Sequence, residues 1–285
     1  MNGILADNKV GTAWGALLRQ LESRMDKRES EQTASAIVNH VLGWTRAERI
    51  MRQGEMLSES QLLGLYQCGK RVAGGEPLQY VTGVAWFLGQ PFQVNPDVLI
   101  PRPETEELVI HALSLLPTPE ARVLDIGTGS GCVAISLALR APAAQVSACD
   151  ISEGALACAV QNAQKTGAHV HFFPCDILIE EPAGPWDLIL SNPPYIPRSE
   201  AHTLDPHVRE AEPHLALFVD DDRPLLFYER IALLLSQQAF GAQACCEIHP
   251  PFAEALTDLG NTAQLETHIM RDAQQRPRIL TWKKR

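Results

Sequence analysis

The strongest constraint on the fold is an alternation of apolar runs and amphipathic segments between residues 121 and 191. The first two connections carry apolar residues at helical spacing, and Ser152 is a suitable N-cap for the second of these helices. Because consecutive strands joined through helices pair in parallel, we expect an α/β fold, a parallel sheet with helices on both faces. The predicted strands lie at 121–126, 145–149, 169–173 and 186–191.

The C-terminal third continues this plan after a long polar connection that follows residue 192. The carboxyl ends of parallel strands meet at one edge of the sheet, and open α/β sheets bind their ligands there. We therefore look for functional residues at strand ends. The remaining expected elements are a helix at 225–238, a strand at 243–248, a helix at 252–259, and two strands at 264–270 and 278–283.

The N-terminal region has a different character. Residues 1–78 carry apolar residues at helical spacing and predict a bundle of four or five helices, with capping boxes beginning at Thr45 and Ser58. Residues 79–103 predict a β-hairpin linker whose first strand covers 80–87. Residues 104–285 then form the domain that carries the sheet. Since that domain is complete without the bundle, we expect residues 1–78 to recognise a partner.

Three glycines follow the first predicted strand, in the sequence Gly127-Thr128-Gly129-Ser130-Gly131. Glycine lets the backbone turn tightly and approach a ligand closely, because it has no Cβ. The second strand ends at Asp150, which can accept hydrogen bonds from both hydroxyls of a ribose. These features favour a cofactor with an adenosine part. They leave its chemistry open, because dinucleotide-dependent dehydrogenases share them.

Two further strand ends bring polar groups to the same edge. Asp176 follows the third strand and can accept a hydrogen bond from an adenine amine. The fourth strand ends in Ser191-Asn192-Pro193-Pro194-Tyr195. Its prolines lack an N–H and keep the segment extended, so the Asn192 side-chain oxygen and nearby carbonyls remain free to accept. Such acceptors suit a planar group that carries an NH2, and the Tyr195 ring can cover its face.

Composition limits the partners and the setting. The net charge of −10 is opposite to the basic surface of proteins that bind a phosphate backbone, so no direct contact with nucleic acid is expected. The seven cysteines include no Cys-x-x-Cys pair and predict buried thiols in a reducing compartment. With neither a signal peptide nor an apolar run of about 20 residues, we expect a soluble, cytoplasmic protein without membrane contact. His169 and His171 alternate on a strand, and no metal site is expected.

The segment 125–131, with Asp150, Asp176 and the segment 191–195, resembles the class-I S-adenosylmethionine-dependent methyltransferases. Three further stretches narrow the resemblance, over about residues 35–285, to the peptide chain release factor glutamine methyltransferases of the PrmC/HemK family; they are 75–83, 99–106 and 208–217. The resemblance implies an N-terminal helical bundle, a hairpin linker and a seven-stranded Rossmann-like sheet. It also implies methyl transfer from S-adenosyl-L-methionine to the glutamine of the Gly-Gly-Gln loop of class I release factors, with S-adenosyl-L-homocysteine as product.

The resemblance assigns the site residues by position. Asn192 and Pro193 would act in catalysis by accepting the hydrogens of the glutamine amide, with Pro194 and Tyr195 completing the substrate site. The segment Glu247-Ile248-His249, followed by two prolines, departs from the family's usual Glu-Ile-Gly or Glu-His-Gly. The residues implied to bind the cofactor are Gly127, Thr128, Gly129, Ser130, Gly131, Asp150, Asp176, Ile177 and Asn192.

Other functions remain open at this point. A methyltransferase acting on an exocyclic amine of a nucleic-acid base presents the same NH2 to the same motif, and the negative charge argues against it. A methyltransferase for a ribosomal-protein glutamine is a near neighbour. A nicotinamide-dependent oxidoreductase would explain the glycines and Asp150 but not Asn192 to Tyr195. A binding module without catalysis is the last alternative. We expect a monomer, and the preferred release factor is left open.

Overall fold

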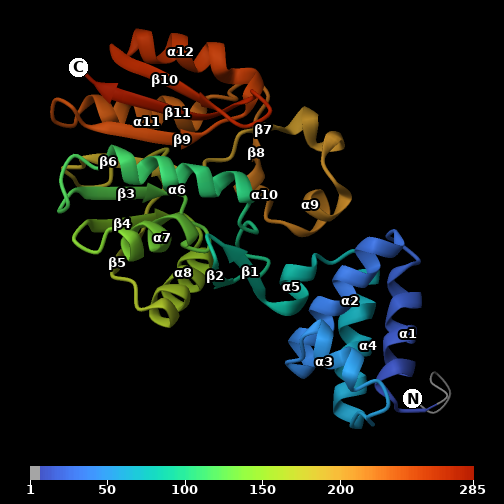
Figure 1. Cartoon of the computed structure of the whole chain (residues 1–285). Helices are drawn as coiled ribbons and strands as arrows, with labels where there is room; N and C mark the ends of the chain where they lie inside the picture. The colour runs from blue at the N-terminus through green and yellow to red at the C-terminus, as the bar shows by residue number, and fades with distance from the viewer. Residues whose placement is uncertain (1–6) are drawn as a thin grey trace. The chain divides into compact units, whose positions relative to one another are not determined.

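The structure is a computed structural model that describes residues 7–285. It divides into two compact units (Figure 1). The first combines the N-terminal residues through Gly83 with the short helix α9 (Pro206–Ala211), and the second combines Val84–Asp205 with Glu212–Arg285. The first unit thus extends beyond the expected boundary at residue 78, and it includes a segment from the connection that follows residue 192.

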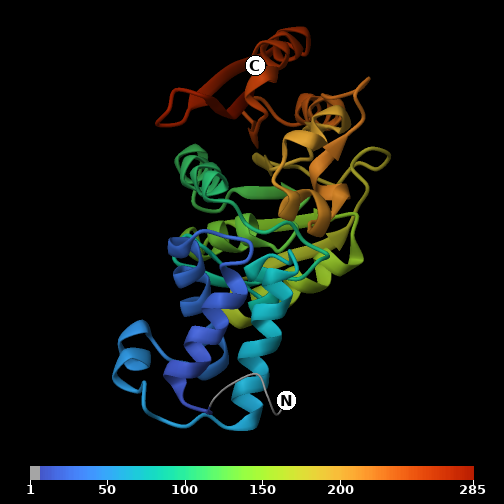
Figure 2. The same cartoon turned by 90° about the vertical axis from the view of Figure 1, so that its right-hand side faces the viewer.

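The first unit is a helical bundle, as expected. Helices α1, α2 and α4 lie side by side in both views (Figures 1 and 2). Thr45 and Ser58 form the two predicted capping boxes with Glu48 and Gln61, which satisfies N–H groups that each helix start would otherwise leave unpaired. The N-terminal helices are α1 (Val10–Leu21), α2 (Lys27–Leu42), α3 (Arg46–Met51), α4 (Glu59–Ala73) and α5 (Leu78–Thr82).

The prediction that the first hairpin strand begins at residue 80 is wrong. Residues up to Thr82 are helical, and Gly83 ends the helix with a left-handed φ of 71°. The hairpin consists of β1 (Val84–Phe87) and β2 (Gln90–Gln93). A helix of five residues is too short to show a helical period, so the β-branched and aromatic residues of this stretch suggested a strand instead.

The second unit contains the predicted seven-stranded sheet, in the order β10-β11-β9-β6-β3-β4-β5. Only β11 is antiparallel to its neighbours, and the other pairs are parallel. The sheet therefore confirms the predicted α/β class and the predicted alternation of strands and helices. Its strands are β3 (Arg122–Ile126), β4 (Gln145–Asp150), β5 (Val170–Pro174), β6 (Leu188–Ser191), β9 (Gln243–Glu247), β10 (Leu265–Arg271) and β11 (Pro277–Lys284).

Helices cover both faces of the sheet, as Figure 1 shows. Side chains alternate across a strand, so neighbours such as Val123 and Leu124 contribute to different cores. Val123 packs with α6 (Pro103–Leu115) and α7 (Cys132–Arg140), and α8 (Glu153–Thr166) lies beside β5. Leu124 packs on the other face with α11 (Leu226–Ser236) and α12 (Ala253–Thr262). Chain order reverses between β3 and β6, which is where sheets of this type open to a ligand.

The connection after β6 is more ordered than the sequence suggested. Its two short strands, β7 and β8, pair in parallel. These elements are too short to show a hydrophobic period, which is why the sequence indicated only a polar connection. Over residues 7–285, no helix is both long and apolar enough to cross a membrane. The short elements are β7 (Ile196–Pro197), η1 (Arg198–Thr203), α10 (His214–Leu217), β8 (Phe218–Val219) and, after β9, η2 (Pro250–Phe252).

Candidate active site

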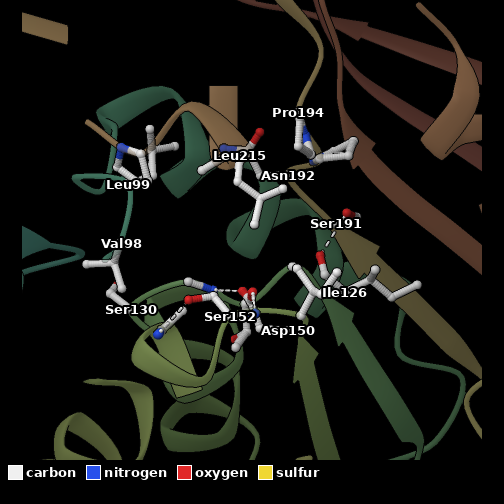
Figure 3. A pocket seen from close by; sticks show the side chains of 18 of the residues that line it. Val98, Leu99, Ile126, Ser130, Asp150, Ser152, Ser191, Asn192, Pro194 and Leu215 are labelled. Carbon is white, nitrogen blue, oxygen red and sulfur yellow. Dashed lines mark hydrogen bonds between the residues drawn. The ribbon is translucent and has the colours of Figure 1, made fainter. Parts of the chain in front are cut away.

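A cavity of about 310 Å³ opens where β3, β4 and β6 end (Figure 3). This size lies at the lower end of small-molecule sites. Figure 3 shows Asp150 and Ser152 on one side of the cavity, with Asn192 and Leu215 across from them. Most residues predicted for the site line it together: Gly127, Thr128, Gly129, Ser130, Asp150, Asp176, Ile177, Asn192, Pro193 and Pro194. Gly131 and Tyr195 lie outside the lining.

The glycine loop turns sharply at the end of β3. The N–H groups of Gly127 and Thr128 both donate to the carbonyl oxygen of Cys149, at 2.9 and 3.0 Å. Gly127 and Gly129 have φ values of 70° and 56°, which side chains rarely adopt, and a Cβ on either would meet no atom within 4 Å. That open space is where a ligand can approach the backbone. At Gly131, by contrast, a Cβ would come within 2.8 Å of Ile135, so this glycine serves packing against the helix.

Asp150 is held by the loop that it faces. Its Oδ2 accepts from the Gly129 N–H and its Oδ1 from the Ser152 N–H, both at 2.9 Å. A carboxylate oxygen accepts more than one hydrogen bond, so both oxygens can also receive a ligand hydroxyl. Burial raises the pKa of Asp150 above its usual range. The arrangement suits a group that brings two hydroxyl donors, as a ribose does.

Asp125 lies behind the glycine loop and is 1% exposed. The Thr128 hydroxyl donates to its Oδ2 at 2.7 Å. Burial raises the pKa of Asp125 to about 7, although the Thr128 hydrogen bond favours the ionised form.

After the end of β5, Asp176 accepts from the Leu178 N–H at 3.0 Å, and Ile177 contributes a buried apolar surface.

The opposite wall of the cavity is built from side-chain hydrogen bonds. Asn192 Nδ2 donates to Thr105 Oγ1 at 3.1 Å, and this hydroxyl donates to Glu247 Oε2 at 2.6 Å. The Tyr195 hydroxyl donates to the other carboxylate oxygen, Oε1, at 3.0 Å. Burial raises the pKa of Glu247, while the two hydroxyls and Arg278 oppose that rise. Asn192 and Tyr195 from one segment, with Thr105 and Glu247 from two others, thus form one network.

The ring of Tyr195, whose hydroxyl belongs to this network, is covered on one face. The ring stacks on His249, with centroids 5.9 Å apart and planes 10° apart. His249 Nε2 lies 2.9 Å from Glu200 Oε2, which links the end of β9 to η1. Burial raises the pKa of the Tyr195 hydroxyl. The residue is fixed at its hydroxyl and at its ring face.

The rim of the cavity is fixed by Glu212. Its Oε1 accepts from Arg102 Nη2 at 2.5 Å and its Oε2 from the Ile100 N–H at 3.1 Å. The side chain of Glu212 is 2% exposed, so this ion pair holds the 99–102 segment firmly at the rim. Leu215 also lines the cavity, although 59% of its surface is exposed.

Sequence reasoning gives no role in the site to Thr105, Glu247 or Glu212. Thr105 and Glu212 lie in the stretches 99–106 and 208–217, which carry the family resemblance. Glu247 ends a buried strand, as Asp150 does, and Asn192 directly follows one, so the strand end is the signal that could have indicated Glu247. No group of three or more potential metal ligands occurs within residues 7–285.

Comparison with known proteins defines the class of enzyme first. Residues 106–216 match the model of the methyltransferase small domain, and residues 16–83 match that of the PrmC N-terminal domain. The fold is similar to the hMettl16 catalytic domain, solved in complex with MAT2A 3'UTR hairpin 6, with a TM-score of 0.55 and 14% identity over 76% of this chain and 81% of that one. The second unit is therefore a methyltransferase domain.

The relatives in sequence identify the family. The release factor glutamine methyltransferase of Chlorobaculum tepidum is 36% identical over 264 residues, with 88% of each chain covered. That of Bacteroides thetaiotaomicron is 38% identical over 272 residues, covering 93% of this chain and 97% of its own. The chain belongs to the release factor glutamine methyltransferase family.

Proposed function

We propose that this protein transfers a methyl group from S-adenosyl-L-methionine to the side-chain amide nitrogen of the glutamine in the Gly-Gly-Gln loop of peptide chain release factors. The observation that carries the proposal is that Asn192 and Pro193 share one cavity with Gly127, Gly129 and Asp150. Acceptors for an NH2 group and a cradle for an adenosyl group thus lie within the same small space. The relatives that cover most of the chain are named for this activity.

The cofactor part of the proposal fits the observed wall. The open space over Gly127 and Gly129 admits a ligand against the backbone, and the two oxygens of Asp150 suit ribose hydroxyls. Thr128, Ser130, Asp176, Ile177 and Asn192 complete that contact, and Gly131 supports the loop by close packing. When bound, S-adenosylmethionine supplies an electrophilic methyl group, and the chain's own residues then have to align the acceptor.

Alignment is the main task because an amide nitrogen is a weak nucleophile. Its lone pair is delocalised into the carbonyl group. We propose that Asn192 Oδ1 and the Pro193 carbonyl oxygen accept the two amide hydrogens, which fixes the nitrogen and favours the positive charge that develops on it. The proton becomes acidic only as the new bond forms, so no carboxylate has to remove it beforehand. A direct contact of Pro194 and Tyr195 with the substrate amide stays a prediction.

Mass spectrometry of a purified release factor tests the proposal. We expect one added methyl group on the glutamine of the Gly-Gly-Gln loop after incubation with the enzyme and S-adenosylmethionine, and much slower addition with the Asn192→Ala variant. Ribosomal proteins and oligonucleotides, incubated separately, test the two methyltransferase alternatives. Methylation of either, with an unmodified release factor, would overturn the proposed substrate.

For the first unit we propose a role in holding the release factor. Met51 and Met56 are 76% and 64% exposed and Ile50 is 48% exposed, so three large apolar side chains of this unit reach the solvent within a short stretch. Replacing both methionines by serine is expected to raise the KM for a release factor without changing cofactor affinity. Ile110→Ser, at an exposed position of α6, is the matched control. An unchanged KM in the double variant would argue against this surface.

A further inference from the structure

We propose that Thr105 and Glu247, supported by Tyr195, are positioning residues that determine which end of the Asn192 amide faces the cavity. The inference rests on the proposed function, because it concerns the site that would hold the substrate amide. None of these three residues needs to touch the reacting atoms. Their effect would pass through Asn192.

The direction of each hydrogen bond follows from counting hydrogens. The Thr105 and Tyr195 hydroxyls both donate to Glu247, and such hydrogen bonds favour the ionised carboxylate, which can only accept. The Thr105 hydroxyl has a single hydrogen. At 2.6 Å from Glu247 Oε2, that hydrogen is committed to the carboxylate. Thr105 Oγ1 can then only accept, so its partner in Asn192 has to be the NH2 group, as observed at 3.1 Å. Asn192 Oδ1 is thereby left as the end available to the cavity.

Shape alone would not achieve this selection. The oxygen and NH2 of an asparagine side chain are similar in size, and rotation of the amide by 180° exchanges them. The rotated amide would present NH2 to the NH2 of the substrate, with no acceptor for its hydrogens. Only the donors and acceptors around Asn192 separate the two orientations. Thr105 is the partner that the structure provides for this purpose.

The carboxylate at the base of the network is itself fixed. Glu247 is 3% exposed, and its second oxygen accepts from the Tyr195 hydroxyl at 3.0 Å. Tyr195 in turn stacks on His249, which pairs with Glu200. Both oxygens of Glu247 are therefore occupied by donors from different segments. This leaves the carboxylate no free rotation that would release Thr105.

Thr105→Val tests the hydroxyl at nearly constant shape. We expect kcat to fall about ten-fold or more, the rate equivalent of one hydrogen bond, with cofactor affinity unchanged. Thr105→Ser restores a hydroxyl and should recover most of the loss. Thr281→Val is the matched control, because Thr281 is also buried and hydrogen-bonded, to His111 at 2.9 Å, but lies outside the cavity lining. The Thr281→Val variant is expected to have the same kcat as the wild type.

Glu247→Gln tests the direction of the hydrogen bonds. A glutamine NH2 can donate to Thr105, whose hydrogen is then free to bond Asn192 Oδ1, so the Asn192 amide can rotate. We expect a fall in kcat of about ten-fold or more with an unchanged melting temperature and cofactor affinity. A purely structural role for Glu247 would instead lower the melting temperature and leave kcat of the folded enzyme intact.

Nitrogen-15 NMR of the Asn192 side chain reads the network without any methyl acceptor. Its NH2 signals, identified by their loss in Asn192→Asp, should shift and exchange faster with water in Thr105→Val but not in Thr281→Val. Unchanged Asn192 signals in Thr105→Val, or a wild-type kcat there, would overturn the inference. If these signals respond as expected but the wild type modifies no release factor, only the proposed function fails.

Discussion

The two walls of the cavity are held in different ways. The glycine-loop wall relies on backbone N–H groups, and its hydrogen bonds join residues close in sequence, such as Gly129 and Asp150, which are 21 positions apart. The Asn192 wall relies on side chains, and its bonds join residues 87 and 142 positions apart. A backbone donor persists whatever the side chain is, whereas a side-chain network fails when one member is changed. Truncation of one side chain should therefore disturb the geometry of the second wall more than that of the first.

The largest effect on turnover is expected from Asn192→Ala, which removes from the Asn192 wall the side-chain oxygen that would accept an amide hydrogen. Turnover should fall by about 10²–10³, the usual cost of one preorganised polar contact to a transition state. Much of the cofactor affinity should remain, because the glycine-loop wall stays intact. Single-turnover methyl transfer to a release factor measures the first quantity and calorimetry the second. A wild-type rate would contradict the mechanism.

The glycine-loop wall also contains the buried carboxyl of Asp125, which should make the free energy of unfolding depend on pH. Its pKa is about 7 in the folded protein against 3.8 for the free side chain, so the folded state holds a proton that the unfolded state has released. The resulting stability is fully present below pH 4 and is lost as the pH rises through 7. Between pH 5 and 8 the free energy of unfolding should fall by about 2–3 kcal/mol from this group.

Asp125→Asn should remove that part of the pH dependence in urea unfolding experiments. Asp187→Asn is the control with the opposite sign. The Arg122 side chain lowers the pKa of Asp187, so its contribution is present above the usual pKa and is lost only as the pH falls below it. Equal slopes between pH 5 and 8 in wild type and Asp125→Asn would show that Asp125 has no raised pKa.

Asp150→Ala tests the glycine-loop wall at its ligand. Loss of its hydrogen bonds should weaken S-adenosylmethionine binding by about 1–3 kcal/mol. Because the Asn192 wall is unaffected, saturating cofactor should restore most of the turnover, which is the reverse of Asn192→Ala. Calorimetry that shows unchanged affinity would exclude the ribose role. Binding of NADH instead would point to an oxidoreductase.

The same contrast explains what the sequence could reveal. Sequence alone indicates Asp150 and Asn192, because the first ends an apolar strand, the second directly follows one, and strand ends of a parallel sheet share one edge. Thr105 and Glu247 lie 142 positions apart, and no local pattern indicates that α6 begins beside the end of β9. The pairing depends on the complete sheet order. Likewise α5 and the β7–β8 pair are too short to show a hydrophobic periodicity, so tertiary packing determines their conformation.

The smallest effect separates two roles for Tyr195. If its ring only covers the substrate amide, Tyr195→Phe keeps the ring and leaves the rate unchanged. If its hydroxyl holds Glu247, the same variant loses the 3.0 Å hydrogen bond and should cost about 1 kcal/mol of transition-state stabilisation, or roughly five-fold in kcat. Tyr195→Ala should cost more in either case, because the ring also packs on His249. The deciding measurement is kcat for Tyr195→Phe in a Thr105→Val background. Should the hydroxyl act through Thr105, the loss disappears there, since the connection to Asn192 has already been cut.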